Sequence, residues 1–286
     1  MISDITLGQF FPGTSAIHRL DPRTKIILAI IYIVAIFVAN TPAAFLFMAI
    51  VTCFVVGATQ ISTKVIIKGV KPIIFILLFT SMLNIFMTVG ESEPLVSFYF
   101  INIYAEGIIR AVFMSLRVIL LIIGTSVFLT YTTSPINLTD GIESLLSPLK
   151  KIKVPVHSFA MMMSIALRFI PTLVEETEKI MNAQKSRGAD FSSGGLIKRA
   201  KSLIPILVPL FVSSFKRADE LAVAMECRCY RGDNNRTKLV KLEYHASDFV
   251  WMASALAIMA LIIVSNVFLS GINTSDLFSL IFFYRI

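Results

Sequence analysis

The sequence contains few charged residues. Only 15% of its 286 residues are Asp, Glu, Lys or Arg, whereas 56% are hydrophobic, and a typical soluble domain has about a quarter of its residues charged. Four long stretches lack all four charged residue types, at 26–63, 72–90, 118–139 and 249–275. This distribution excludes an ordinary soluble protein, because about 20 consecutive apolar residues suffice to cross the hydrocarbon of a membrane.

Residues that could form a catalytic or metal site are also scarce. The histidines His18, His157 and His245 lie far apart and form no H-E-x-x-H motif of a zinc protease. Cys227 and Cys229 have no second cysteine pair nearby, whereas a structural zinc site normally needs four ligands. The G-x-x-x-x-G-K-[ST] loop of an ATPase is missing. The sequence therefore predicts a protein that is not an enzyme and that has no cofactor or metal of its own.

The uncharged stretches predict five membrane-spanning helices. Residues 26–63 are too long for one span, and the turn Asn40-Thr41-Pro42 divides them, because proline lacks an amide donor and restricts the residue before it. Three further spans are predicted at about 72–89, 107–131 and 249–269. The expected fold is therefore an all-α integral membrane protein.

Basic residues mark the cytoplasmic ends of these spans. They precede the first span and separate the second from the third, at Arg19, Arg23, Lys25, Lys64, Lys68 and Lys71. The positive-inside rule then places the N-terminus in the cytoplasm of a multi-pass plasma-membrane protein. It also explains the net charge of +8, so a nucleic-acid partner is not expected.

Three regions are predicted along the chain. Residues 1–131 form an N-terminal membrane region with four spans, and residues 249–286 form the last span with an external tail. Between them, residues 132–248 are rich in both charged and apolar residues, which predicts a cytoplasmic region of long amphipathic helices.

Two amphipathic segments in this region, 173–184 and 209–230, are expected to cross in contact. Small residues recur at four-residue spacing, which lets helix backbones approach closely. They are Ala160, Ser164, Ser214, Ala218 and Ala222. The charged faces, which include Glu176 and Arg217, are predicted to point away from the apolar sides.

The predicted spans have no acidic residue in their interior, which disfavours ion-driven transport by this chain alone. Arg117 is the one unusual charge, in the outer half of the fourth span. A functional role is the default interpretation of such a residue. A structural role, in which Arg117 reaches outward or pairs with Glu106, is favoured here.

The run Pro12–Lys25 reads PGTSAIHRLDPRTK. Asp21 and Pro22 can begin a helix as N-cap and first residue, and the cations hold this end in the cytoplasm. The run also resembles the N-terminal signature of EcfT, the transmembrane (T) subunit of energy-coupling factor (ECF) transporters.

Two later segments are similar to the coupling region of that family. The first comprises LRFIPTL at 167–173 and AQKSRGAD at 183–190. The second comprises PLF at 209–211, RADELA at 217–222 and AMECRCYRG at 224–232. Each segment ends in a tripeptide that resembles the Ala-Arg-Gly tripeptides of the family, and the resemblance covers nearly the whole chain.

Both tripeptides depart from the family pattern but keep their arginine. Ser186 replaces alanine in Ser186-Arg187-Gly188, and Cys227-Arg228-Cys229 stands where Ala-Arg-Gly is common. Cys229 carries a β-carbon where glycine would permit a left-handed helix end, which leaves the geometry after Arg228 open.

The resemblance implies one subunit of a four-part importer of vitamins or similar micronutrients. Its partners would be two cytosolic ABC-type ATPases, which bind ATP and Mg, and one or several exchanging substrate-binding membrane (S) subunits. The resemblance assigns ATPase binding to six residues, Ser186, Arg187, Gly188, Cys227, Arg228 and Cys229. An arginine suits this role, because the helix dipole favours a cation at a C-terminal end and the guanidinium can bind a carboxylate with two donors.

A second candidate surface is the apolar run 203–215, which Pro205 and Pro209 interrupt and which is too short for a comfortable span. It is a candidate contact for the S subunit through Leu203, Ile206, Leu207, Leu210 and Phe211. Burial within the chain itself is the alternative. Other interpretations of the whole chain are a stand-alone secondary carrier, a membrane enzyme, a conventional ABC permease, or the T subunit of a cobalt or nickel importer.

Overall fold

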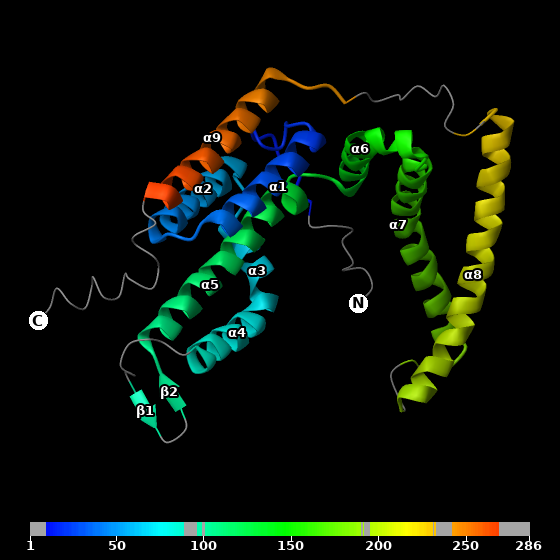
Figure 1. Ribbon diagram of the computed structural model, residues 1–286. Coiled ribbons are helices and arrows are strands. Elements are labelled where there is room, and N and C mark those ends of the chain that lie inside the picture. Colours follow the sequence, from blue (N-terminus) through cyan, green and yellow to red (C-terminus); the bar gives the residue numbers. More distant parts are fainter. Residues whose placement is uncertain are drawn as a thin grey trace, which may run out of the picture. The chain divides into compact units, whose positions relative to one another are not determined.

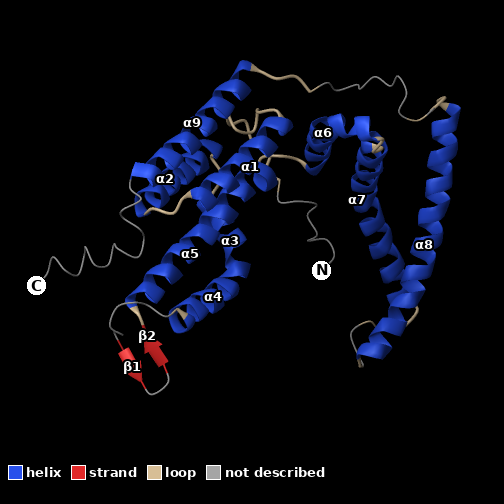
Figure 2. Ribbon diagram, viewed as in Figure 1, coloured by secondary structure: helices blue, strands red, loops and turns tan. Residues whose placement is uncertain are grey.

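The computed structural model describes residues 10–88, 96–98, 101–189, 191, 195–230, 232 and 242–268 (Figure 1). Helices make up most of these residues, and two short strands are the exception (Figure 2). The described residues of Pro135–Lys241 form one compact unit, the α6–α8 unit. Those of Gln9–Ser134 and Leu242–Ile286 form the other, which we call the bundle.

The bundle packs its helices around α5 and α1. Helix α5 contacts α1, α2, α3 and α4, and helix α9 contacts α1 and α2. The elements are α1 Pro22–Val38, α2 Pro42–Thr59, α3 Thr63–Val70, the 3-10 turn η1 Lys71–Ile73, α4 Ile74–Met87, β1 Val96–Phe98, β2 Ile101–Ile103, α5 Ala105–Thr125, the π-helix η2 Ser126–Tyr131 and α9 Ala246–Phe268.

The first two helices begin where the sequence predicts. The Asp21 carboxylate accepts a hydrogen bond from the Arg23 amide at 2.8 Å, and Pro22 occupies the first helical position. Thr41 caps α2 in the same way, ahead of Pro42. Both caps satisfy an amide that would otherwise lack a partner within the helix.

Close approach of α1 and α5 depends on Gly124. A β-carbon at this position would lie 2.1 Å from a ring carbon of Tyr32, a separation that no side chain can accept. The Tyr32 hydroxyl donates to the Leu120 carbonyl at 2.9 Å and lies 2.7 Å from the Thr52 hydroxyl. One tyrosine therefore links α1 to both α5 and α2.

The turn between α1 and α2 is held by two polar side chains from other helices. The Arg117 guanidinium of α5 donates to the Ala39 carbonyl at 2.8 Å and to the Asn40 side chain at 3.3 Å. Asn266 of α9 donates to the Val38 carbonyl. Arg117 also lies over the Phe45 ring of α2, 5.1 Å from its centroid, so its partners are structural.

Five described helices are long and apolar enough to cross a membrane by length and composition: Pro42–Thr59, Thr63–Met87, Ala105–Tyr131, Val156–Ser186 and Ala246–Phe268. The number agrees with the prediction, but the set differs. Val156–Ser186 falls in the region predicted to be cytoplasmic, whereas the predicted first span, α1, has only 17 residues. The third predicted span also begins earlier, because α3 continues through η1 into α4.

The fold is helical as predicted, with one addition. Strands β1 and β2 pair antiparallel, with Val96 opposite Ile103 and Phe98 opposite Ile101. The pair lies in the connection between α4 and α5 (Figure 1), which the sequence analysis did not assign to any element.

The α6–α8 unit consists of α6 Pro135–Leu146, the 3-10 helix η3 Ser147–Ile152, α7 Val156–Ser186 and α8 Leu196–Cys227. Helix α7 contacts both α6 and α8, and the buried pair Glu143–His157 joins α6 to α7 at 2.8 Å. Pro171, Pro205 and Pro209 lie inside the two long helices rather than at their ends.

Candidate functional site

Helices α7 and α8 contact each other in an antiparallel arrangement (Figure 1). The Glu176 carboxylate of α7 accepts hydrogen bonds from the Ser213 hydroxyl and, at 3.0 Å, from the Arg217 guanidinium. Arg217 also lies over the Phe169 ring, 5.8 Å from its centroid. We call these four residues the α7–α8 clasp. The predicted contact between the helices is confirmed.

The prediction was wrong about which residues make this contact. Glu176 and Arg217 come from the faces that were expected to point away. Ala218 and Ala222 are exposed, and Ala160 is buried at a cavity that α6 and α7 line together. These three alanines therefore do not form the α7–α8 contact, to which the Glu176–Arg217 ion pair and the Ser213 hydroxyl contribute.

The clasp predicts a non-additive effect on stability. Glu176→Gln and Arg217→Gln should each lower the melting temperature of the purified protein, since an ion pair of partly exposed side chains contributes up to about 1 kcal/mol. The double variant should lose less than the sum of the single losses, because each change already removes the same interaction. Strictly additive losses in thermal unfolding would show that the two residues act independently.

Helix α7 ends in a Schellman motif built around Arg187. Arg187 is the C-cap, and Gly188 follows with a left-handed φ of 88°. The Gly188 amide donates to the Lys185 carbonyl at 2.9 Å, and the Ala189 amide donates to the Gln184 carbonyl at 3.0 Å. These are the two hydrogen bonds that define the motif.

Helix α8 ends in the same way at Arg228. The Cys229 amide donates to the Glu226 carbonyl at 2.8 Å, and the Tyr230 amide donates to the Met225 carbonyl at 3.1 Å. Cys229 takes the left-handed position with a φ of 56°. The geometry that the sequence left open is thus the glycine-type geometry, adopted by a cysteine.

Both tripeptides are exposed, and each holds an arginine at the end of a long helix. Neither the Arg187 nor the Arg228 guanidinium is paired with a carboxylate among the described residues. Arg187 lies about 16 Å beyond Glu176 along α7, and Arg228 lies about 22 Å beyond Ser213 along α8, from the rise of an α-helix. Because the helices are antiparallel, the arginines are on the order of 40 Å apart.

The cysteine at the left-handed position predicts opposite effects of two substitutions. Cys229→Gly should stabilise the end of α8 by roughly 1 kcal/mol, because glycine adopts this conformation without steric cost. Cys229→Val should destabilise it, since a β-branched side chain is least tolerated there. Hydrogen exchange of the Tyr230 amide should therefore slow in the first variant and accelerate in the second. Identical exchange in both variants would contradict this description of the helix end.

The candidate S-subunit contact on α8 is largely exposed. Leu207 and Phe211 are 58% and 65% exposed, and Leu203 is exposed beside them, whereas Ile206 is 4% exposed and Leu210 is half-buried. Further exposed apolar residues extend this face: Ile204, Val208, Val212 and Phe215. We call the exposed residues of this surface the α8 apolar face: Leu203, Ile204, Leu207, Val208, Phe211, Val212 and Phe215. Of the five predicted contact residues, only Ile206 is buried within the chain.

The N-terminal motif folds around His18. Its Nε2 lies 3.0 Å from the Phe11 carbonyl, which can only accept a hydrogen bond, so Nε2 carries the proton. Nδ1 then accepts from the Ser15 hydroxyl at 2.6 Å. Burial lowers the pKa of His18, in agreement with this neutral form. His18 therefore stabilises the turn of residues 11–18 through these two hydrogen bonds.

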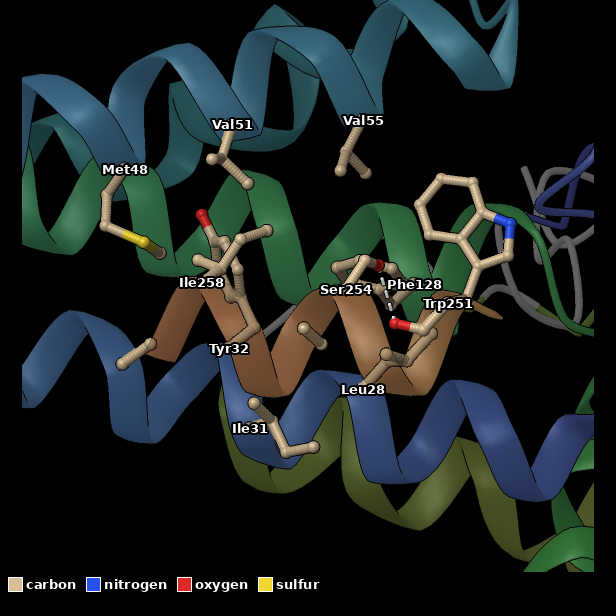
Figure 3. A pocket seen from close by; sticks show the side chains of 12 residues that line it. Leu28, Ile31, Tyr32, Met48, Val51, Val55, Phe128, Trp251, Ser254 and Ile258 are labelled. Carbon is tan, nitrogen blue, oxygen red and sulfur yellow. Dashed lines mark hydrogen bonds between the residues drawn. The ribbon is translucent and has the colours of Figure 1, made fainter. Parts of the chain in front are cut away.

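The bundle contains a cavity between α1, α2, η2 and α9 (Figure 3). Its walls are apolar side chains such as Leu28, Val55 and Trp251, with Tyr32 and Ser254 as the polar exceptions. The Ser254 hydroxyl donates to the Trp251 carbonyl of its own helix at 2.8 Å, and the Tyr32 hydroxyl donates to Leu120. This cavity offers no charged group to a polar substrate.

Comparison with known proteins shows the family to which this chain belongs. Residues 13–239 match the family model CbiQ, which is described as a cobalt transport protein. The chain belongs to this family. Its curated relatives are named energy-coupling factor transporter transmembrane protein EcfT, which confirms the resemblance found in the motifs. The chain is thus a membrane component of the energy-coupling factor type.

Three of these relatives cover most of both chains. The protein of Clostridium kluyveri is 54% identical over 93% of this chain and 98% of its own. That of Ruminiclostridium cellulolyticum is 55% identical over 87% and 92%. That of Bacillus subtilis is 48% identical over 92% and 98%.

Two groups of residues escaped the sequence analysis as functional candidates. Glu176 and Arg217 of the clasp were assigned to the charged helix faces, Lys25 was counted among the basic residues that mark a cytoplasmic end, and Asp248 was given no role. In both cases the partners lie far along the chain, 41 residues for Arg217 and Glu176 and 227 residues for Asp248 and Asp21. The one available signal was Asp248 itself, an acid directly before the uncharged stretch 249–275.

Proposed function

We propose that the chain is the transmembrane coupling subunit of an ECF-type ABC importer. It transmits conformational change from two cytosolic ATPases to a substrate-binding membrane subunit and so drives uptake of vitamins or related micronutrients. It does not hydrolyse ATP itself; the partner ATPases bind ATP and Mg. One observation carries the proposal, namely two identically built, arginine-capped helix ends on one antiparallel helix pair.

Each arginine-capped helix end has the properties needed to bind in an acidic groove of a partner protein. The helix dipole favours a cation at the C-terminus, and a guanidinium can bind a carboxylate through two parallel hydrogen bonds. A separation on the order of 40 Å along the helices is too large for one groove. It suits two separate ATPases, one at Arg187 and one at Arg228.

The clasp gives the helix pair a way to transmit movement. Glu176 and Arg217 lie between the two docking ends, so a change in the distance between the ATPases becomes a change in the angle between α7 and α8. Rigid elements that pivot at one interface are a common device for such transmission. We propose that the α8 apolar face carries this movement to the S subunit.

The α8 apolar face supports a membrane partner. Leu203, Leu207 and Phe211 repeat every four residues and therefore form one continuous stripe on the helix. Exposed apolar surface of this kind marks a site of interaction with a protein or with the membrane. Because these residues lie on the same helix as Arg228, an S subunit bound there would respond directly to movement of an ATPase.

The charge distribution supports an N-terminus in the cytoplasm of a prokaryotic cell. Basic residues lie before α1 and in its first turn, and in the connection from α2 to α4, and the positive-inside rule places both ends inside. The charged C-terminal half of α7, from Arg168 to Arg187, would then face the cytosolic ATPases.

Two rival functions make different demands. A stand-alone secondary carrier needs polar groups at a central site, and the cavity of the bundle is apolar. A cobalt or nickel importer would keep the same coupling role, and the matching CbiQ family model is described as a cobalt transport protein. The identity of the S subunit and of its substrate separates this second candidate from vitamin uptake.

Reconstitution tests the proposal. Proteoliposomes that contain the chain with its copurified ATPases and S subunit should take up tritiated riboflavin, thiamine, biotin or pantothenate only when ATP and Mg reach the ATPases. Proteoliposomes with the chain alone should take up none of them. Uptake by the chain alone, driven by an ion gradient, would overturn the coupling role in favour of a carrier.

A further inference from the structure

Lys25 fixes the point at which the chain leaves the bundle. It lies in the first turn of α1 and is only 2% exposed. Its ammonium donates to the Thr132 carbonyl at 2.8 Å and to the His18 carbonyl at 3.1 Å. Thr132 directly follows the π-helix, and Pro135 begins α6 of the other unit. The ammonium therefore holds the last turn before the exit.

Asp248 fixes the point at which the chain returns. It lies in the first turn of α9 and is fully buried. Its carboxylate accepts hydrogen bonds from the Asp21 amide at 3.0 Å and from the His245 amide at 2.8 Å. Asp21 caps α1, so Asp248 ties the start of α9 to the start of α1.

A third contact strengthens the return segment. The Arg23 guanidinium pairs with the Asp21 carboxylate at 2.9 Å and lies over the Tyr244 ring, 3.9 Å from its centroid. Residues 21–25 thus contact the exit at Thr132 and the return at 244–248. In the part of the chain that the structure describes, these are the two places where the chain passes between the bundle and the α6–α8 unit.

Burial of the Lys25 and Asp248 charges costs free energy, so their hydrogen-bond partners show which segments these residues hold. Taking an ammonium and a carboxylate out of water is expensive unless hydrogen bonds replace the lost hydration. Here Lys25 binds the Thr132 carbonyl at the exit, and Asp248 binds the His245 amide at the return; the other partner of each charge is a backbone group of the N-terminal motif, at His18 and Asp21. A backbone group has no side-chain rotamers of its own, so a hydrogen bond to it restrains the path of the connecting chain.

We propose that Lys25 and Asp248 are positioning residues for force transmission. This inference rests on the proposed function. Movement of the α6–α8 unit reaches the bundle through the exit and return segments, and these two residues couple both segments to α1. Without them the connections lengthen under load, and ATP hydrolysis proceeds without productive movement of the bundle. The N-terminal motif therefore acts as the anchor of both connections.

The test measures coupling in the reconstituted complex. Lys25→Met and Asp248→Asn should retain both ATPases, and their ATP hydrolysis should stay within twofold of the wild type. Uptake of the tritiated vitamin that the wild-type complex imports, chosen from riboflavin, thiamine, biotin and pantothenate, should fall at least tenfold. The number of ATP molecules hydrolysed per molecule imported should therefore rise at least tenfold.

Matched controls separate coupling from stability. Tyr32→Phe removes a buried hydrogen bond of the same bundle without touching either connection, so its coupling ratio should stay within twofold of the wild type. Lys25→Gln, which can still donate to one carbonyl, serves if Lys25→Met does not accumulate in the membrane.

Three outcomes would be decisive. A raised ratio in the Lys25 and Asp248 variants alone supports the inference. Equal losses of hydrolysis and uptake, or an unchanged ratio, overturn it, because either result indicates a merely structural role. A wild-type complex that lacks ATPases would instead contradict the proposed function.

Discussion

Replacement of both arginine caps, Arg187→Glu and Arg228→Glu, is expected to abolish association with the two ATPases. Each arginine binds a different ATPase in the proposed complex, and a charge-assisted hydrogen bond contributes about 1.5–3 kcal/mol, so each ATPase should lose about ten- to a hundredfold in affinity. Repulsion between the new glutamates and an acidic groove would add to this loss. Copurification of the ATPases with the tagged chain measures it, and the chain itself should remain in the membrane.

Charge reversals elsewhere on the same helices provide the control. Lys179 and Lys216 are exposed on α7 and α8, and neither lies at a helix end. Lys179→Glu with Lys216→Glu makes the same change in net charge, and association should persist. Equal loss of the ATPases in both double variants would indicate a general electrostatic effect. Retention of the ATPases by the Arg187 and Arg228 double variant would refute the docking assignment.

The second large effect is expected at the α8 apolar face. Leu207→Asp with Phe211→Asp should remove the S subunit from the complex while both ATPases remain bound. Burial of each large apolar side chain contributes about 1.5–3 kcal/mol, and a carboxylate buried without a partner costs more. Quantitative mass spectrometry of the purified complex should show the S subunit reduced at least tenfold relative to the ATPases.

Val223→Asp is the matched control for this pair. Val223 lies on α8 and is 58% exposed, like Leu207, but it falls outside the predicted contact. The S subunit should therefore stay bound in this variant. If the Leu207 and Phe211 double variant retained the S subunit, the contact would have to lie on another surface.

The sequence predicted the helix beginnings well because their signals are local. Asp21-Pro22 and Thr41-Pro42 each combine a capping side chain with a proline at the first helical position. The internal prolines were harder to interpret. Pro205 and Pro209 were expected to interrupt the apolar run 203–215, yet α8 continues through both, as α7 continues through Pro171, because packing in a long helix can outweigh one lost backbone hydrogen bond.

The C-terminal ends of α7 and α8 differ in how well the local sequence predicts their geometry. Gly188 marks a left-handed end directly, because glycine is the usual residue there. Cys229 gave no such signal, and its conformation follows from the hydrogen bonds that the Cys229 and Tyr230 amides make to Glu226 and Met225. Two paired amides outweigh the steric cost of one β-carbon, which is on the order of 1–2 kcal/mol.

Contacts between distant segments could not be predicted from periodicity. A hydrophobic pattern assigns Glu176 and Arg217 to solvent because it contains no information about a neighbouring helix. The same holds for Lys25, whose partner carbonyl at Thr132 lies 107 residues away. The alanines at regular spacing on α8 were a false signal, since Ala218 and Ala222 are exposed.

The most direct test of the coupling role is the composition of the complex in its native host. The tagged chain would be solubilised gently and purified, and the copurifying proteins would be identified by mass spectrometry while ATP hydrolysis is assayed on the same sample. We expect two ABC-type ATPases, at least one small membrane protein and measurable ATP hydrolysis. A chain that purifies alone, hydrolyses no ATP and still transports in vesicles would contradict the account.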